Sequence, residues 1–227
     1  MRKESRILNY KYPDQTVWPI SHLIFDLDNT LYPASSRLAD EMHRRMTNFV
    51  AQYLKISLSQ AEIIRKAGFT RHGTTMRWLQ VEQGMQNPAE FLEYVHPVNL
   101  SEFLVPAPEL RPFIESIPLP KVILTNAPHN HAQRILKFYG IEDCFGEIFD
   151  LEANNYVGKP NQSVYEKCLS AMACPAQEAI FIDDIPAYLE TFDMIGGHCI
   201  LVDEKRHNEI NKWHSIPTIL DLIRHLT

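Results

Sequence analysis

The stretch from residue 22 to residue 33, His-Leu-Ile-Phe-Asp-Leu-Asp-Asn-Thr-Leu-Tyr-Pro, constrains the fold of this chain more than any other. Its apolar run Leu23–Phe25 is typical of a buried parallel strand, and Asp26 and Asp28 follow where that run ends. Carboxylates this close to a core strand cost on the order of a few kcal/mol in desolvation unless a cation or hydrogen bonds compensate them. Since ligands bind at the carboxyl ends of strands in open α/β sheets, we interpret the two acids as a site at a strand tip. A capping pair at an ordinary strand-to-loop turn explains this stretch equally well.

The size and charge of the chain narrow the classes of protein that it can represent. With 227 residues and 26.3 kDa, it can form one large domain or a core domain that carries a smaller insert. Its formal net charge of -6 argues against a general binder of nucleic-acid polymers or anionic membranes. A small phosphorylated metabolite is compatible with this charge, because a local cation can invert the field of a site.

The cysteines and the apolar segments favour a cytoplasmic enzyme. The chain has four cysteines, Cys144, Cys168, Cys174 and Cys199. None belongs to a Cys-x-x-Cys pair, so we expect reduced and mostly buried thiols. The first six residues carry charge with no apolar run behind them, which argues against a signal peptide. No segment approaches the roughly 18 apolar residues of a membrane helix.

The first half of the chain predicts an inserted helical module. Residues 1–20 are polar and irregular, and we expect an arm or an edge piece there. From 36 to 103, apolar residues recur at helical spacing with no strand candidate between them. Proline-bearing segments at 31–35 and 104–108 flank this block. Connections of this kind at both ends are typical of a helical lid that two linkers join to a core domain.

From residue 109 onward, the pattern alternates between helix and strand. Short apolar runs predict buried strands at 122–124, 148–149, 180–182 and 199–202. Helical stretches separate these runs, and a helix over 218–226 is expected to close the chain. Repeated strand–helix–strand units predict an α/β protein with a doubly wound, Rossmann-like parallel sheet.

Polar residues stand where several of these segments end. In chain order they are Thr125, Asn126, Lys159 (which Pro160 follows), Asp183 and Asp184. The predicted topology puts them on the carboxyl side of the sheet, so one crevice can collect them with Asp26 and Asp28. Each residue alone has an ordinary structural explanation, and an Asp-Asp pair is often only a turn. The ordered set is what indicates a functional site.

This ordered set resembles the four-motif signature of the haloacid dehalogenase superfamily. The matching elements are Asp26-x-Asp28-x-Thr30, Thr125, Lys159-Pro160 and Asp183-Asp184. The helical block sits where this superfamily inserts its cap. The resemblance therefore implies a core domain of residues 1–33 and 105–227 and an α-helical cap domain of residues 34–104.

Within the superfamily, the chain resembles the pyrimidine 5′-nucleotidase branch. The similar stretches are 25–32, 73–77, 124–134 and 136–145. The resemblance implies a Mg²⁺-dependent phosphomonoesterase that acts on nucleoside monophosphates or similar small phosphate esters.

The implied metal ligands are oxygen atoms, which suit Mg²⁺ because this ion bridges carboxylates to phosphate. By resemblance, Asp26 supplies one carboxylate ligand, Asp28 its backbone carbonyl, and Asp184 the second carboxylate. Asp183 lies outside these ligands and hydrogen-bonds waters on the metal.

The resemblance also implies roles in phosphoryl transfer. Asp26 attacks phosphorus and forms an aspartyl-phosphate, while Asp28 protonates the leaving group and then deprotonates the attacking water. Lys159 neutralises charge at the reacting centre. The phosphoryl oxygens are held by Thr125 and by backbone amides near Leu27 and Asn126.

Other functions stay open at this point. A sugar phosphomutase shares the aspartyl-phosphate, as does a sugar-phosphate phosphatase, and a non-catalytic regulatory domain can retain the fold. A dehalogenase is disfavoured by Asp28, because halide leaves without a proton and dehalogenases of this superfamily lack the second acid. For His129 and His131 we prefer a polar helix start to a transition-metal site, since no third ligand is in view. The oligomeric state cannot be inferred.

Substrate specificity is the least constrained property. In the predicted cap, polar candidates for contact with the leaving group are Arg71, His72, Thr74, Thr75 and Arg77. The sequence also departs from the superfamily pattern after the paired acids. Ile185 and Tyr188 replace a small polar residue and an asparagine, so we expect a rearrangement behind Asp184.

Overall fold

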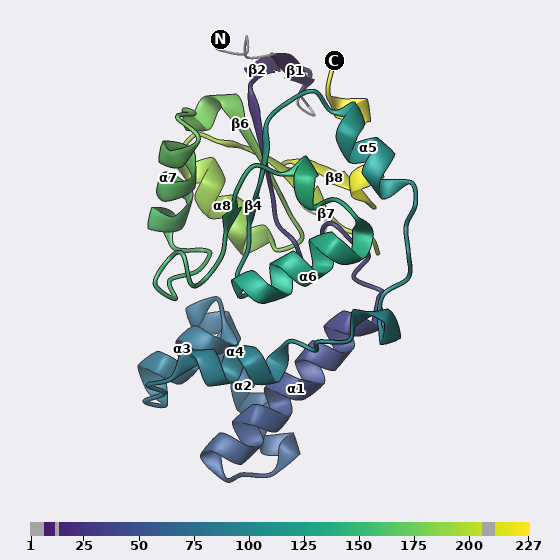
Figure 1. The fold of residues 1–227 in the computed structure, drawn as a ribbon. Helices are drawn as coiled ribbons and strands as arrows, with labels where there is room; N and C mark the ends of the chain where they lie inside the picture. The colour runs from purple at the N-terminus through teal and green to yellow at the C-terminus, as the bar shows by residue number, and fades with distance from the viewer. Residues whose placement is uncertain (1–6, 12–13, 206–211) are drawn as a thin grey trace.

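Six parallel strands form the central sheet in the computed structural model, which describes residues 7–11, 14–205 and 212–227 (Figure 1). The strand order is β5-β4-β3-β6-β7-β8, and β3 lies in the middle. The strands are β3 (His22–Phe25), β4 (Lys121–Leu124), β5 (Ile148–Phe149), β6 (Ala179–Asp183), β7 (His198–Val202) and β8 (His214–Ile216). The predicted α/β fold class is confirmed. The edge strand β8 was not predicted, because three residues with one buried side chain give no pattern to recognise.

Helices cover both faces of this sheet because successive strand residues point to opposite sides. Leu23 and Phe25 share a core cluster with Ile114 and Ile135, which come from helices on one face. Ile24 belongs to the cluster on the other face. The first face carries α5 (Leu110–Ser116), α6 (His129–Tyr139) and the 3₁₀ helix η4 (Ile219–His225); the second carries α7 (Gln162–Ala171) and α8 (Pro186–Met194). Shorter 3₁₀ turns are η1 (Leu100–Glu102), η2 (Glu142–Cys144) and η3 (Ala176–Glu178).

The N-terminal arm is more regular than expected where it is described. Instead of an irregular segment, β1 (Leu8–Lys11) and β2 (Val17–Ile20) form an antiparallel hairpin. Shortly before β2, the Asp14 side chain accepts a hydrogen bond from the backbone N–H of Thr16 at 2.9 Å. Pro19 within β2 concealed this strand, since proline argues against an interior strand and is tolerated only at an edge. Residues 1–6 and 12–13 of the predicted arm lie outside the described residues.

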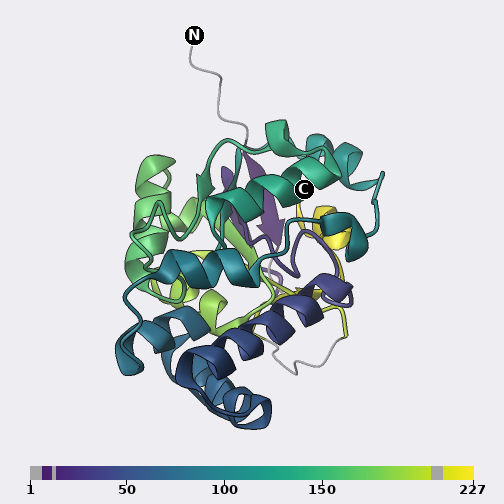
Figure 2. The same cartoon turned by 60° about the horizontal axis from the view of Figure 1, so that its bottom comes forward.

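Four helices between β3 and α5 form a separate helical group at the carboxyl ends of the strands (Figures 1 and 2). They are α1 (Arg37–Leu54), α2 (Leu58–His72), α3 (Thr75–Glu82) and α4 (Pro88–Val95). No strand occurs within this part of the described chain, as the sequence predicted. The division into domains at residues 34 and 104 stays a prediction.

Two further expectations can be compared with the described residues. All four cysteines are free thiols, and three of them are buried, as predicted. None of the helices that the structure describes has the length and apolarity needed to cross a membrane.

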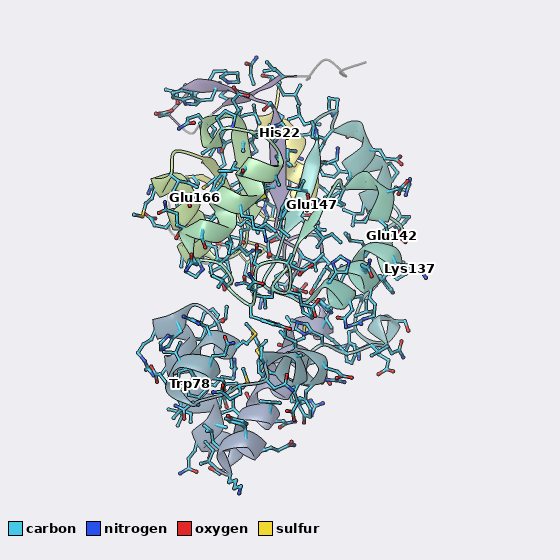
Figure 3. All side chains as sticks on the ribbon, turned by 60° about the vertical axis from the view of Figure 1, so that its left-hand side comes forward. His22, Trp78, Lys137, Glu142, Glu147 and Glu166 are labelled. Carbon is cyan, nitrogen blue, oxygen red and sulfur yellow. The ribbon has the colours of Figure 1, made fainter. Side chains whose placement is uncertain are left out.

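One tight contact within the helical group is the close approach of α2 to α3. Gly68 in α2 faces the indole ring of Trp78 in α3, which is 1% exposed. A Cβ atom added at Gly68 would lie 2.3 Å from that ring. Trp78 lies in this helical group, whereas His22 at the start of β3 lies toward the opposite end of the molecule (Figure 3). The glycine is therefore a packing requirement between two helices.

We predict that Gly68→Ala lowers the free energy of unfolding. Overpacking costs about 1–3 kcal/mol and outweighs the gain of about 1 kcal/mol in helix propensity. Chemical denaturation measures the change, and Thr70→Ala on the exposed side of the same helix is the matched control, expected within about 0.5 kcal/mol of wild type. An alanine variant at residue 68 that equals or exceeds wild-type stability would contradict the proposed packing.

Candidate active site

The loop after β3 brings two acids to the end of the sheet. The backbone N–H of Asp26 donates to the carbonyl of Ile182 at 2.8 Å, so Asp26 continues the pairing of β3 with β6. The chain then turns at Asn29, whose φ of 62° lies in the left-handed region that asparagine tolerates better than most residues. The Asn29 side chain donates to Asp184 at 3.4 Å. This turn therefore ties the first acidic segment to the last.

Lys159 joins the two central strands through their acids. Its Nζ is 2.6 Å from Asp26 Oδ1 and 2.6 Å from Asp183 Oδ2, and its side chain is 1% exposed. Burial alone would lower the pKa of the Lys159 ammonium, but the two carboxylates outweigh this effect and raise the pKa above its ordinary value. Lys159 is thus a fixed positive charge among the acids.

Three carboxylates gather around this ammonium. One oxygen from each of Asp26, Asp183 and Asp184 lies within 4.8 Å of the others. The pKa of Asp26 is raised to about 7, mainly by burial. The negative charges of Asp183 and Asp28 raise this pKa further, and Lys159 lowers it. Burial and the charges of Asp183 and Asp26 raise the pKa of Asp184 well above the ordinary value. The negative charge exceeds the positive charge, and an all-oxygen donor set of this kind fits a hard divalent cation such as Mg²⁺.

Asp28 makes a different set of contacts. Its Oδ1 accepts hydrogen bonds from the Tyr32 hydroxyl at 2.5 Å and from His131 Nε2 at 2.9 Å. Burial would raise the pKa of Asp28, but His131, His96 and Tyr32 outweigh it and lower the pKa to about 2. No donor among the described residues is bonded to Oδ2, so one oxygen of Asp28 is fixed and the other is available.

His131 was missed as a site residue by the sequence analysis. The expected helix start is confirmed, since His129 and His131 both lie in the first turn of α6. His129 lies 2.7 Å from Asp150, whereas His131 is fully buried and contacts Asp28, which was not predicted. Among the described residues, Nδ1 of His131 has no hydrogen-bond partner, so we assign the proton to Nε2. The ring of His96, at the end of α4, packs on it with centroids 4.5 Å apart. No local pattern could reveal these contacts, because they join residues far apart in the chain.

Thr125 and Asn126 follow β4, as predicted, and reach the same region. The Thr125 hydroxyl accepts from the backbone N–H of Ala127 at 3.0 Å, which leaves its own hydrogen free to donate. The Asn126 side chain binds the backbone of Lys159 in both directions, accepting from its N–H at 2.7 Å and donating to its carbonyl at 3.0 Å. Asn126 thereby fixes the position of Lys159.

The unusual residues after the paired acids have defined contacts. The backbone N–H of Ile185 donates to Asp183 Oδ1 at 2.7 Å, an interaction that does not depend on the side chain of residue 185. The ring of Tyr188 lies 5.1 Å from Lys159 Nζ, and its hydroxyl donates to the carbonyl of Gly73 in the helical group at 2.8 Å. Tyr188 therefore supports the lysine and links the sheet to the helices.

A cavity of about 170 Å³ separates these acids from the helical group. Core residues at its surface include Asp26, Asp28, Asn29, Thr125, Asn126, Lys159 and Asp184. Thr74 and Thr75 also line it, as the sequence analysis proposed. The other cap candidates, Arg71, His72 and Arg77, line a different surface hollow. Helical-group residues that were not predicted include Met42, His43, Met46, Arg65, Phe69, Met76, Phe91, Leu92 and His96.

Comparison with known sequences gives a consistent match. A protein-family model described as haloacid dehalogenase-like hydrolase matches residues 20–192. "Phosphate metabolism protein 8" of Saccharomyces cerevisiae is 26% identical over 204 residues, which cover 82% of this chain and 63% of that protein. The chain thus spans less than two thirds of the length of this relative.

Similar solved structures share the fold. A HAD phosphatase from Thermococcus onnurineus has a TM-score of 0.63 at 17% identity, over 89% of this chain and 96% of that chain. The HAD-hydrolase YfnB of Bacillus subtilis, bound to magnesium, has a TM-score of 0.59 at 14% identity over the same shares. Several other similar structures are haloacid dehalogenases. At these identities the likeness supports the fold alone.

We predict opposite effects of Asp184→Asn with and without a divalent cation. In EDTA at neutral pH the variant melts at a higher temperature than wild type, because repulsion among the buried carboxylates is relieved. Each kcal/mol of added stability corresponds to about 2–4 °C in melting temperature. The folded state raises the pKa of Asp184 and so favours its protonated form, and the wild type therefore loses stability as pH rises above the ordinary carboxyl range. Added Mg²⁺ raises the melting temperature of the wild type but not that of Asp184→Asn.

Differential scanning fluorimetry measures these shifts. Exposed Glu90→Gln on α4 removes one negative charge away from the cluster and is the control, expected to respond to Mg²⁺ as wild type does. An Asp184→Asn variant that gains as much stability from Mg²⁺ as the wild type would exclude Asp184 as a ligand.

Proposed function

The chain belongs to the haloacid dehalogenase-like hydrolases, and from this premise we propose that it is a Mg²⁺-dependent phosphomonoesterase working through an aspartyl-phosphate. Nucleoside monophosphates are the proposed substrate class, by resemblance to the pyrimidine 5′-nucleotidase branch. The observation that carries the phosphatase proposal is Asp28, a second acid held apart from the carboxylate cluster with one free oxygen. Such a group serves a reaction whose leaving group needs a proton.

The proposed metal ligands are the carboxylates of Asp26 and Asp184 and the backbone carbonyl of Asp28. Both oxygens of Asp183 are already engaged, one by Lys159 and the other by the N–H of Ile185, which supports an outer position for that acid. When bound, Mg²⁺ supplies positive charge that offsets the repulsion between the carboxylates and the phosphate. The choice of metal, though not of ligands, agrees with the similar structure of YfnB from Bacillus subtilis, which is bound to magnesium.

In the first proposed step, a carboxylate oxygen of Asp26 attacks phosphorus and the bond from phosphorus to the leaving oxygen breaks. Asp28 gives its proton to that oxygen, while Thr125 and the backbone amides of Leu27 and Asn126 hold the phosphoryl oxygens. The low pKa keeps Asp28 ionised in the free site, so Asp28 takes up this proton from solvent when the negatively charged phosphoryl group comes alongside and favours the protonated form.

In the second step, water attacks phosphorus, and Asp28 takes the proton of that water. The bond between phosphorus and the Asp26 oxygen breaks, which releases phosphate and restores the carboxylate. After the first step Asp28 is a carboxylate again, and its free oxygen can orient the water before it accepts the proton. Lys159 stabilises the negative charge on Asp26 in both steps.

The main competing class is a dehalogenase, because several similar structures have that activity. Halide departs without a proton, so a dehalogenase has no use for an acid placed two residues after the nucleophile. In this chain Asp28 is present and oriented by two donors. The name of the yeast relative also refers to phosphate metabolism, which favours phosphate esters.

We predict that Asp26→Asn abolishes Mg²⁺-dependent hydrolysis, since an amide cannot act as the nucleophile. Asp28→Asn lowers kcat for UMP by about 10² to 10⁴. The same variant loses less activity toward p-nitrophenyl phosphate, whose leaving group departs without a proton. Phosphate release across a panel of nucleotide and sugar phosphates, with chloride release from 2-chloropropionate in parallel, measures these effects.

Each outcome of that panel is informative. Substantial Mg²⁺-dependent activity of Asp26→Asn would remove the assigned nucleophile. Hydrolysis of sugar phosphates without UMP or CMP would exclude the nucleotidase, and dependence on a bisphosphate activator would indicate a phosphomutase. Chloride release without phosphate release would establish a dehalogenase, and no turnover of any kind would favour a regulatory domain.

We further predict that His131→Leu lowers kcat for nucleoside monophosphates by about 10- to 100-fold, which corresponds to the loss of one hydrogen bond to a charged group. Activity toward p-nitrophenyl phosphate changes much less, because His131 acts by positioning Asp28. His131→Gln retains a donor near Nε2 and restores part of the loss. His129→Gln, which alters a histidine that contacts Asp150, is the control. Equal losses on both substrates would assign His131 a structural role only.

A further inference from the structure

Arg65 in α2 is a buried cation without an anionic partner. The residue is 7% exposed, and no carboxylate of the described residues lies within 4.0 Å of its guanidinium. Nε donates to the Thr47 hydroxyl at 3.2 Å, and Nη1 lies 3.9 Å from the Met46 sulfur, which is a weak acceptor. Glu62, one turn away on the same helix, pairs with Lys66 instead. Arg65 is thus largely buried, but its guanidinium reaches the cavity wall, and a cation placed there without a carboxylate partner indicates an acceptor that binds from the cavity.

The position of Arg65 suggests what that acceptor is. Arg65 lines the cavity that also contains Asp26 and Asp28, and it does so from the helical group. Other arginines of this group are satisfied differently: Arg44 and Arg71 lie 2.8 Å from glutamates at the surface. The unpaired donors of Arg65 therefore lie where the leaving group of a substrate would be if its phosphate were bound at the acids.

The other walls of the cavity restrict the shape of this leaving group. Met42, Met46, Phe69 and Phe91 contribute thioether and aromatic surface on the same side as Arg65. Thioethers and aromatic rings pack well against a flat apolar ring, whereas the guanidinium requires an oxygen to accept its hydrogen bonds. Together they fit a ring that carries a carbonyl oxygen or a carboxylate.

We propose that Arg65 determines specificity by binding a carbonyl or carboxylate oxygen of the leaving group. This inference rests on the proposed phosphatase function and deepens it. A pyrimidine base is a flat ring with such carbonyl oxygens, the adenine base is a flat ring without them, and phosphoglycolate offers a carboxylate without a ring. The guanidinium is oriented toward this oxygen by the hydrogen bond from Nε to Thr47, which does not line the cavity.

The test compares substrates with and without an oxygen acceptor on the leaving group. We expect Arg65→Met to lower kcat/KM for UMP and CMP by about 10- to 100-fold, the factor for one hydrogen bond to a charged group. Phenyl phosphate and AMP should change by less than about 3-fold, since they offer no such oxygen. Phosphoglycolate separates the two sources: a loss confined to it would identify a carboxylate, and a loss confined to UMP and CMP a carbonyl.

Two further measurements test the proposal if Arg65→Met is inactive. Thr47→Val keeps the charge but releases Nε, and it should give the same selectivity change in smaller measure. The melting temperature of Arg65→Met should equal or exceed that of wild type, because an unpaired buried charge is replaced by an apolar chain.

Equal losses on phenyl phosphate and UMP, or a large fall in melting temperature, would make Arg65 a structural residue and overturn the proposal. Unchanged selectivity in both variants would do the same. A wild-type protein that hydrolyses no phosphate ester would instead refute the proposed function, which is a distinguishable result.

Discussion

The site depends on the Lys159 ammonium, which lies 2.6 Å from Asp26 after β3 and 2.6 Å from Asp183 at the end of β6. These strands are neighbours at the centre of the sheet, so the parallel pairing brings their terminal acids together. Without a cation between them, buried carboxylates at this spacing would repel each other and take up protons. Lys159 compensates part of this charge and leaves an excess that suits a divalent cation. Asn126, Tyr188 and Phe181 hold the lysine in place.

The helical group contributes to the site at several separate points. Gly73 accepts a hydrogen bond from Tyr188, and His96 packs on His131. Arg65 lines the cavity and pairs with no carboxylate of the described residues. The first two contacts join these helices to residues that touch the acids or their support, whereas Arg65 reaches the cavity and has its own partners, Thr47 and Met46, within the helical group. The helices therefore contact the supports of the acids directly. In our proposal this arrangement lets the sheet supply the phosphoryl chemistry while the helices select the leaving group.

Much of the fold was predictable because buried strands and amphipathic helices leave strong local patterns. The runs before Asp26, Thr125 and Asp184 are apolar and short. Each is followed by a polar residue, which is unusual next to a core strand and therefore indicates a site. The edge strands β1, β2 and β8 left no such pattern, since they are short and β2 contains a proline.

The residues that complete the site were harder to predict for a different reason. His131 lies on a helix start that is polar in any case, and its contact with Asp28 spans 103 positions in the chain. Arg65 occurs in a helix with many exposed charges, and only the packing of α2 against α1 shows that it is buried. Two of the five predicted cap candidates, Arg71 and His72, pair with Glu82 outside the cavity. Tertiary contacts, not local pattern, determine which polar side chains of a helix face a site.

The central claim is that Asp26 forms a covalent bond to phosphorus at this site. Single turnover in ¹⁸O-labelled water, with acid quenching and mass spectrometry of the peptide that contains residue 26, measures this directly. The account predicts a phosphorylated Asp26 during turnover with Mg²⁺, ¹⁸O in the released phosphate, and neither in EDTA. Phosphate release at full rate with Asp26 unmodified at every time point would contradict it.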